Sequence, residues 1–232
     1  GFRLTQHSQV VEAFSNPTWT VLLGLSVPLG VNPITFATRL GYLFAALSLP
    51  TAAAWGPISE RRGLRLEDAL AAAVPLTVTA YGYWACGGLE TGVLSFLLAL
   101  SGALWLRERR DGRTFWSALT LGLVSLTRPE GALYAAVAGV LMVLSRPKPL
   151  ARPSRQEILW TLTLAAIVGA WLALRWNTFG AWVPNTYYAK RDGDFYPRQY
   201  LIGFARENRA SVLAAVLAWP TVNDIPGDVD LA

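Results

Sequence analysis

Charged residues divide this sequence of 232 residues into long uncharged stretches. The uncharged stretches cover residues 13–38, 40–59, 69–89, 91–106, 114–127, 131–145 and 158–174. Several of them reach the roughly 17 to 25 residues that a helix needs to cross about 30 Å of hydrocarbon. Leu and Ala dominate the stretches, and the strict alternation of apolar and polar residues that is typical of strands is absent. The sequence therefore predicts an all-α protein, a polytopic bundle of transmembrane helices with short, broken members.

The composition agrees with a membrane protein and excludes several other classes. Hydrophobic residues make up 53% of the chain and charged residues only 15%, against about 25% charged residues in soluble domains. Cys86 and His7 are the only Cys and His, which excludes a structural zinc site, a disulfide framework and a Cys-x-x-Cys redox pair. The net charge of +5 comes from short arginine clusters between apolar runs, so we expect no nucleic acid partner.

The basic clusters predict how the chain is oriented in the membrane. Residues 107–113 and 146–155 carry four basic residues each, and residues 59–65 carry three. Lys and Arg concentrate in cytoplasmic loops, so we expect these clusters on the cytoplasmic side. The chain between the first two clusters must then leave and return, which places Arg128 at the outer turn. The loop 177–200 is expected on the same outer side.

Prolines complicate the N-terminal part. Pro17, Pro28 and Pro33 break the first uncharged stretch, which is either one short helix with a re-entrant piece or two crossings. We expect residues 69–89 to run outward as one crossing and residues 91–106 to return. The predicted organisation is the end of an external loop at 1–17, a transmembrane core at 18–219 and a polar tail at 220–232.

Three ionisable residues fall toward the outer side of this predicted topology: Glu90, Arg128 and Glu130. Each such group costs at least about 2.5 kcal/mol at the bilayer centre, so it tends to face a polar cavity or a partner. Together with Arg175 they predict one outward-facing polar pocket. The alternative is structural, with Arg128 and Glu130 paired at a helix break and Glu90 in interfacial water.

The expected external loop combines aromatic rings with polar groups. Asn185, Tyr187 and Lys190 add hydrogen-bond donors and a cation to a segment rich in Trp, Tyr and Phe. This mixture suits sugars and phosphates, because a cation stabilises a phosphate leaving group. The alternative is an aromatic belt at the lipid headgroups, where Trp and Tyr are common.

Four short strings occur in order along the chain: EAFSNPTW from residue 12, GGLETG from residue 87, LTRPEGALY from residue 126 and FGAWVPNTYYAK from residue 179. With them the chain resembles bacterial GT-C membrane glycosyltransferases. The nearest group is the polyprenyl-phosphate-sugar-dependent type that includes the arabinofuranosyltransferases of actinobacterial cell walls. RPEG is the most distinctive of the four motifs.

The resemblance implies an enzyme of the bacterial cytoplasmic membrane whose active face is extracytoplasmic. It would take a sugar from a polyprenyl-phosphate donor and transfer it to a glycan, lipid or protein acceptor of the cell envelope. Such enzymes need an Asp in the first external loop, directly after the first transmembrane helix. No acidic residue precedes Glu12, so we expect that helix and the catalytic Asp upstream of Gly1, with this chain as a fragment.

The resemblance also suggests roles for the candidate residues. Arg128, Lys190 and Arg175 would hold the donor phosphate, and Glu90 and Glu130 would orient these cations or the sugar hydroxyls. Asn185 and Tyr187 complete the expected donor site. Some GT-C enzymes use a divalent cation held by carboxylates, but the acidic residues here are too scattered to predict a metal site.

Two other functions fit the same sequence pattern. The first is a non-catalytic membrane scaffold or assembly subunit derived from such a fold, in which broken helices and Trp residues pack against partner subunits. The second is a transporter, because broken helices with charges inside the membrane also build transport sites. No inverted repeat is visible in the sequence, so the transporter ranks below the other two.

Overall fold

The computed structural model describes residues 15–111, 115–145, 152–180 and 182, and in these residues the chain forms helices and no strand. The all-α prediction is confirmed for this part of the chain. The chain divides into the units Gly1–Thr186 and Tyr187–Ala232, and every described residue belongs to the first. The elements are α1 (Pro17–Gly24), α2 (Pro33–Ala53), α3 (Trp55–Glu60), α4 (Leu66–Ala73), the 3₁₀ turn η1 (Val74–Thr77), α5 (Thr79–Cys86), α6 (Thr91–Asp111), α7 (Trp116–Thr127), α8 (Gly131–Leu144) and α9 (Arg155–Phe179).

Among the described helices, α9 alone is long and apolar enough to cross a membrane by length and composition. It has 25 residues, begins with a capping box between Ser154 and Glu157, and ends at Gly180 in the left-handed conformation (φ 66°). Helices α7 and α8 are apolar but shorter, with 12 and 14 residues. The described structure thus contains one candidate span where the sequence predicts several.

Prolines set where the first helices begin. Pro17 and Pro33 lie in the first turns of α1 and α2, where the missing backbone N–H costs no helical hydrogen bond. The Asn32 side chain caps α2 by accepting hydrogen bonds from the backbone N–H groups of Ile34 and Thr35. The first uncharged stretch is therefore a short helix followed by the start of a second helix.

A proline also divides the run 69–89, which we expected to run outward across the membrane. The run is distributed over α4, η1 and α5. Pro75 lies in η1, where its ring and its missing N–H prevent α4 from continuing. The run therefore forms two short helices joined by a 3₁₀ turn.

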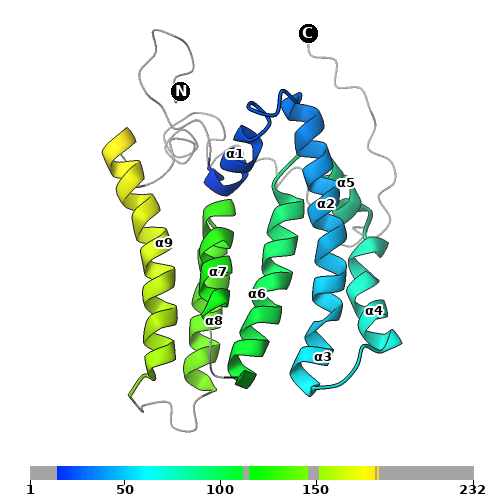
Figure 1. Cartoon of the computed structure of the whole chain (residues 1–232), viewed down its shortest axis with the longest axis vertical. Coiled ribbons are helices and arrows are strands. Elements are labelled where there is room, and N and C mark those ends of the chain that lie inside the picture. The colour runs from blue at the N-terminus through cyan, green and yellow to red at the C-terminus, as the bar shows by residue number, and fades with distance from the viewer. Residues whose placement is uncertain (1–14, 112–114, 146–151, 181, 183–232) are drawn as a thin grey trace, which may run out of the picture. The chain divides into compact units, whose positions relative to one another are not determined.

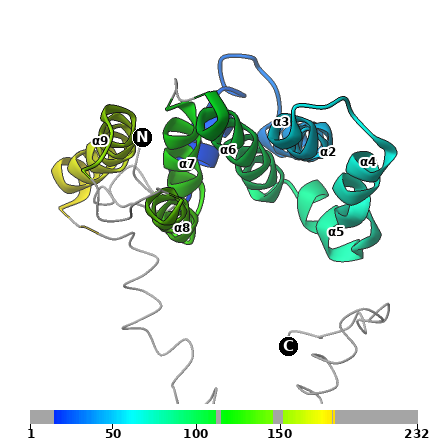
Figure 2. The ribbon, with the colours of Figure 1, turned by 90° about the horizontal axis from the view of Figure 1, so that it is seen from below.

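The described helices follow one another side by side. Figure 2 shows α9 beside α7 and α8, then α6, then α2 with α3, and α4 with α5 beyond them. Tertiary contacts join α2 to α6, α6 to α7, and α7 to both α8 and α9. In Figure 1 the end of α3, the end of α6 and the start of α9 lie at the same end of these helices. The described parts of the three basic clusters therefore share one end, as the orientation argument requires.

Glycine allows α2 and α6 to pack backbone to backbone. A Cβ atom on Gly92 would lie 2.5 Å from the carbonyl oxygen of Gly41, and one on Gly41 would clash with the carbonyl oxygen of Ala85. A larger side chain at Gly92 would push α6 away from α2, and one at Gly41 would push α2 away from α5. The contact lies two residues after Glu90, so it fixes the start of α6.

Small side chains make up much of the described interior, whereas many large apolar side chains face outward. Ser117, Ala118 and Thr127 are fully buried. On α8, by contrast, Leu133 and Leu144 expose 66% and 65% of their surface. In a soluble domain large apolar residues are the ones most often buried, whereas many of the large apolar residues described here are exposed.

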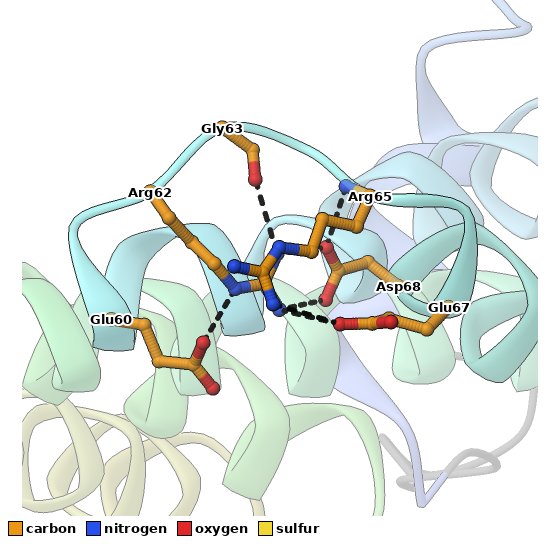
Figure 3. Close-up of polar contacts among 6 residues, drawn as sticks. All are labelled: Glu60, Arg62, Gly63, Arg65, Glu67 and Asp68. Atoms are coloured by element: carbon orange, nitrogen blue, oxygen red, sulfur yellow. Dashed lines mark hydrogen bonds and ion pairs between the residues drawn. The ribbon is translucent and has the colours of Figure 1, made fainter.

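The loop between α3 and α4 is closed by the side chain of Arg62 (Figure 3). Its two terminal nitrogens contact the carboxylate oxygens of Asp68 at 2.5 and 2.7 Å, and its Nε contacts Glu60 at 2.5 Å. Arg62 also donates to the carbonyl oxygen of Gly63, while the backbone N–H of Arg65 donates to Asp68. The hydrogen bonds from Arg62 lower the pKa of Asp68 to about 2 and raise the pKa of Arg62.

Candidate functional site

The candidate site lies at the end of the helices opposite the basic clusters, where α1, the start of α6 and the end of α7 meet (Figure 1). Three polar residues come together there. Asn16 directly precedes α1, Glu90 directly precedes α6, and Arg128 directly follows α7. Each belongs to a different one of the first three sequence strings. The fold brings these three residues together although they lie far apart in the sequence.

The backbone of the RPEG motif explains why Arg128 stands clear of α7. Residues before proline are disfavoured in the helical region, and Arg128, which precedes Pro129, has the extended dihedrals φ −147° and ψ 145°. The helix therefore ends at Thr127. Gly131 then brings α8 back against α7, because a Cβ atom at this position would clash with the carbonyl oxygen of Val124.

Glu90 holds the cluster together through both of its carboxylate oxygens. Arg128 Nε lies 3.0 Å from Glu90 Oε1, and Asn16 Nδ2 donates to Glu90 Oε2 at 3.1 Å. Glu90 is buried, whereas the side chain of Arg128 is 45% exposed. Thr18 secures α1 from the other side by donating to the carbonyl oxygen of Leu123 on α7 at 3.1 Å. The buried carboxylate of Glu90 thus anchors the guanidinium group of Arg128, which is partly exposed at the surface.

Helix dipoles support the same charge arrangement. The carbonyl oxygen of Glu90 accepts the hydrogen bond from Leu94 N that opens α6, so the Glu90 carboxylate lies at the positive end of α6. Arg128 N donates to the carbonyl oxygen of Val124, which places the guanidinium at the negative end of α7. Because α6 and α7 run antiparallel, these two ends are neighbours.

The three arginines considered so far differ in how much of their bonding capacity is used. Arg62 uses all three guanidinium nitrogens and its side chain is 14% exposed. Arg175 is buried, stacks over the ring of Trp171 at 5.4 Å and donates to the carbonyl oxygen of Trp182 at 3.2 Å. Arg128 lies with Nε 3.0 Å from Glu90 Oε1, and its side chain is 45% exposed. Arg128 is therefore the arginine suited to bind an anion.

Two of the predicted pocket residues occupy different surroundings from this cluster. Glu130 is exposed and directly precedes α8. Among the described residues, Arg128 forms its ion pair with Glu90 and not with Glu130. Arg175 lies near the end of α9, where it fixes the chain that follows Gly180. Trp176 and Trp182 stack beside it with ring centroids 4.7 Å apart. The structure thus brings Glu90 and Arg128 together and gives Arg175 contacts of its own.

Several predictions concern residues outside the described part of the chain. Asn185, Tyr187 and Lys190 belong to this group, as do most of the loop 177–200, the polar tail 220–232 and most of the segment 1–17. Asn16, by contrast, is described and is a site residue to which the sequence argument gave no role. Its position before Pro17 and an apolar helix is typical of a helix start and was the available signal.

A second polar cluster, at the basic end, also escaped the sequence argument. The buried carboxylate of Glu108 on α6 accepts hydrogen bonds from the backbone N–H (2.9 Å) and the hydroxyl of Ser117 on α7. Trp160 on α9 donates through Nε1 to the same hydroxyl oxygen at 2.8 Å. These bonds tie α6, α7 and α9 together. Since every group has a partner, the cluster is structural in character.

The described residues contain no group of three or more His, Cys, Asp or Glu side chains that could hold a metal ion. Glu90 already has two partners, an arginine and an amide. Comparisons of this chain with protein-family models, with curated proteins and with solved structures find no significant match.

Proposed function

We propose that this chain is the membrane core of a glycosyltransferase that takes a sugar from a polyprenyl-phosphate donor and transfers it to an acceptor of the bacterial cell envelope. The observation that carries the proposal is the guanidinium of Arg128. Its Nε lies 3.0 Å from the buried Glu90 and its side chain is 45% exposed, and in this proposal its two terminal nitrogens bind the oxygens of a phosphate. Arginine binds phosphate in this two-pronged way with both geometric and energetic advantage.

The distribution of apolar residues supports a multi-pass membrane protein, in which further short helices join α9 in crossing the bilayer. Only 11% of the most apolar 18-residue stretch of α9 is buried inside the described structure, whereas the core helix of a soluble protein is mostly buried. The large exposed side chains of α8 and the small side chains at the α2–α6 contact fit the same proposal, because helices in lipid pack through small residues. We place the Arg128 end at the extracytoplasmic face, opposite the basic clusters.

In the proposed reaction, the bond between the anomeric carbon of the sugar and the phosphate oxygen breaks. The electron pair of this bond goes to the phosphate, and a new bond forms between the anomeric carbon and the acceptor oxygen. The acceptor proton passes to a carboxylate base. Arg128 would contribute by offsetting the negative charge that develops on the departing phosphate.

Transfer from a radiolabelled polyprenyl-phosphate sugar by the full-length gene product tests this proposal. We expect Arg128→Ala to lower the transfer rate about 100-fold, the size of effect seen when one group that stabilises developing charge is removed. Arg128→Lys should recover only part of this loss, since lysine keeps the charge but not the two-pronged geometry. The matched control is Arg107→Ala at the opposite end, where the side chain is 66% exposed. Wild-type transfer by Arg128→Ala would refute the proposal.

A further inference from the structure

The loop between α3 and α4 carries exposed leucines on a closed frame. The side chain of Arg62 holds the frame together through its ion pairs with Glu60 and Asp68, as Figure 3 shows. Leu64 and Leu66 stay outside these ion pairs and expose 66% and 75% of their surface. Because the loop is already closed by its own ion pairs, little further ordering is needed for the leucines to meet a partner.

The exposed apolar surface continues from the loop along α4. Leu66, Leu70 and Val74 follow one another at intervals of four residues, which places them on one side of the helix. Leu70 exposes 62% of its surface and Val74 exposes 58%. Ala72, which points to the opposite side, is buried. An apolar stripe of Leu66, Leu70 and Val74 therefore leads from the loop to the start of η1.

Exposed arginines accompany the leucines at the basic end. Arg61 ends α3 and is exposed, and Arg65 directly precedes α4 with a side chain that is 59% exposed. Helix α6 contacts α3 and adds Arg107, whose side chain is 66% exposed. Residues 59–68 contain equal numbers of basic and acidic residues, and residues 107–113 contain four basic and two acidic ones. This surface therefore carries a net positive charge.

The order of these groups along the helices identifies the partner. The arginines lie at the basic end, and the apolar stripe on α4 leads away from that end (Figure 1). A bilayer leaflet presents the complementary order, with anionic phosphates at its surface and hydrocarbon beneath them. An acidic soluble protein bound at this end would complement the arginines but would leave the apolar stripe in water.

We infer that the α3–α4 loop anchors the chain to anionic phospholipids of the leaflet at the basic end. Leu64 and Leu66 enter the hydrocarbon boundary, while Arg61 and Arg65 contact the lipid phosphates. The inference rests on the proposed function only for the presence of a membrane, and it concerns the end opposite Arg128.

Lipid selectivity at the loop, measured in nanodiscs, tests the inference. The full chain carries Cys86→Ser and Gly63→Cys, with an environment-sensitive fluorophore on the new cysteine. A Cβ atom on Gly63 has nothing within 4 Å, so the label displaces no neighbour and leaves both leucines in place. The nanodiscs consist of dioleoyl phosphatidylcholine with a small fraction of spin-labelled phosphatidylglycerol or, for comparison, spin-labelled phosphatidylcholine as the quencher.

We expect phosphatidylglycerol to quench the label more strongly than phosphatidylcholine. Arg61→Gln should lower this preference about fivefold, the contribution of one basic residue near an anionic membrane surface. The matched control is Arg39→Gln, because Arg39 is also exposed but lies in α2, nearer the opposite end. Equal quenching by the two lipids, or an equal loss of preference in the two variants, would overturn the inference.

Two further measurements complete the test. Replacing Leu64 and Leu66 together by serine should weaken quenching by both lipids, and unchanged quenching would overturn their place in the hydrocarbon. A label at Leu162→Cys on α9, where the native side chain is 59% exposed, reports whether the chain lies in the bilayer at all. Quenching at position 162 without quenching at position 63 would overturn the anchor alone. Quenching at neither position would overturn both the anchor and the membrane location in the proposed function.

Discussion

Replacing Gly131 by alanine should destabilise the turn that carries Arg128. A Cβ atom at this position would clash with the carbonyl oxygen of Val124 and lie 2.7 Å from the Cα atom of Ser125. Both neighbours are backbone atoms inside α7, so neither can rotate away. The variant must therefore move α8 away from α7 or distort the Arg128–Gly131 turn.

The size of this effect follows from two opposing terms. Overpacking against atoms that cannot move costs up to about 3 kcal/mol. The higher helix propensity of alanine stabilises the folded state by at most about 1 kcal/mol. We expect a net loss of about 2 kcal/mol in the free energy of unfolding, which is a change of about 30-fold in the unfolding equilibrium.

Unfolding by sodium dodecyl sulfate in mixed micelles, followed by far-ultraviolet circular dichroism, measures this loss. Gly169→Ala is the matched control, because Gly169 is an exposed helical glycine with open space around its Cβ position. This control should gain about 0.5 to 1 kcal/mol. A Gly131→Ala variant as stable as the wild-type chain, or two variants that shift in the same direction, would refute the packing derived for the α7–α8 turn.

Three further outcomes are expected. Ser117→Ala removes the partner shared by Glu108 and Trp160 and should cost about 1 to 3 kcal/mol of stability, whereas alanine at the exposed Ser145 should cost little. Arg62 lowers the pKa of Asp68 to about 2. The contribution of this pair to stability should therefore be complete at neutral pH and fall as the pH drops from about 4 toward 2. Unfolding midpoints measured over this pH range should show this loss of stability in the wild-type chain and not in Asp68→Asn. In a Cys86→Ser background, an impermeant thiol reagent on intact cells should label a cysteine at position 193 and spare one at position 111; the reverse labelling would place Arg128 on the cytoplasmic face.

Helix existence was predictable from the sequence wherever an uncharged run ends at a charge and contains no proline. The runs 91–106, 114–127, 131–145 and 158–174 correspond to α6 through α9 with small shifts at their ends. The run 69–89 contains Pro75, and it forms two short helices and a 3₁₀ turn in place of one long helix. A charged residue does not always mark the end of a helix. Arg39 lies inside α2, where its long side chain is exposed and therefore tolerated.

The candidate site was predictable in its residue types but not in its pairing. The sequence singles out Glu90 and Arg128 because ionisable groups are rare in such runs. It offered Glu130 as the partner of Arg128, since the two residues are close in the chain. The fold selects Glu90 instead, because α6 and α7 are antiparallel and their ends meet. Asn16 could not be assigned without knowing that α1 packs against α7.

The carboxylates at the two ends of α6 have a mechanical consequence for this helix pair. At one end Glu90, just before α6, holds the residue that follows α7, and at the other Glu108, on α6, holds the first turn of α7. A slide of α7 along α6 by one helical turn, about 5.4 Å, would break both attachments at once and leave two buried carboxylates without these partners. Piston motion between these helices is thus strongly opposed. Any movement that admits a substrate should instead tilt α8 or α9 against a pair whose register stays fixed.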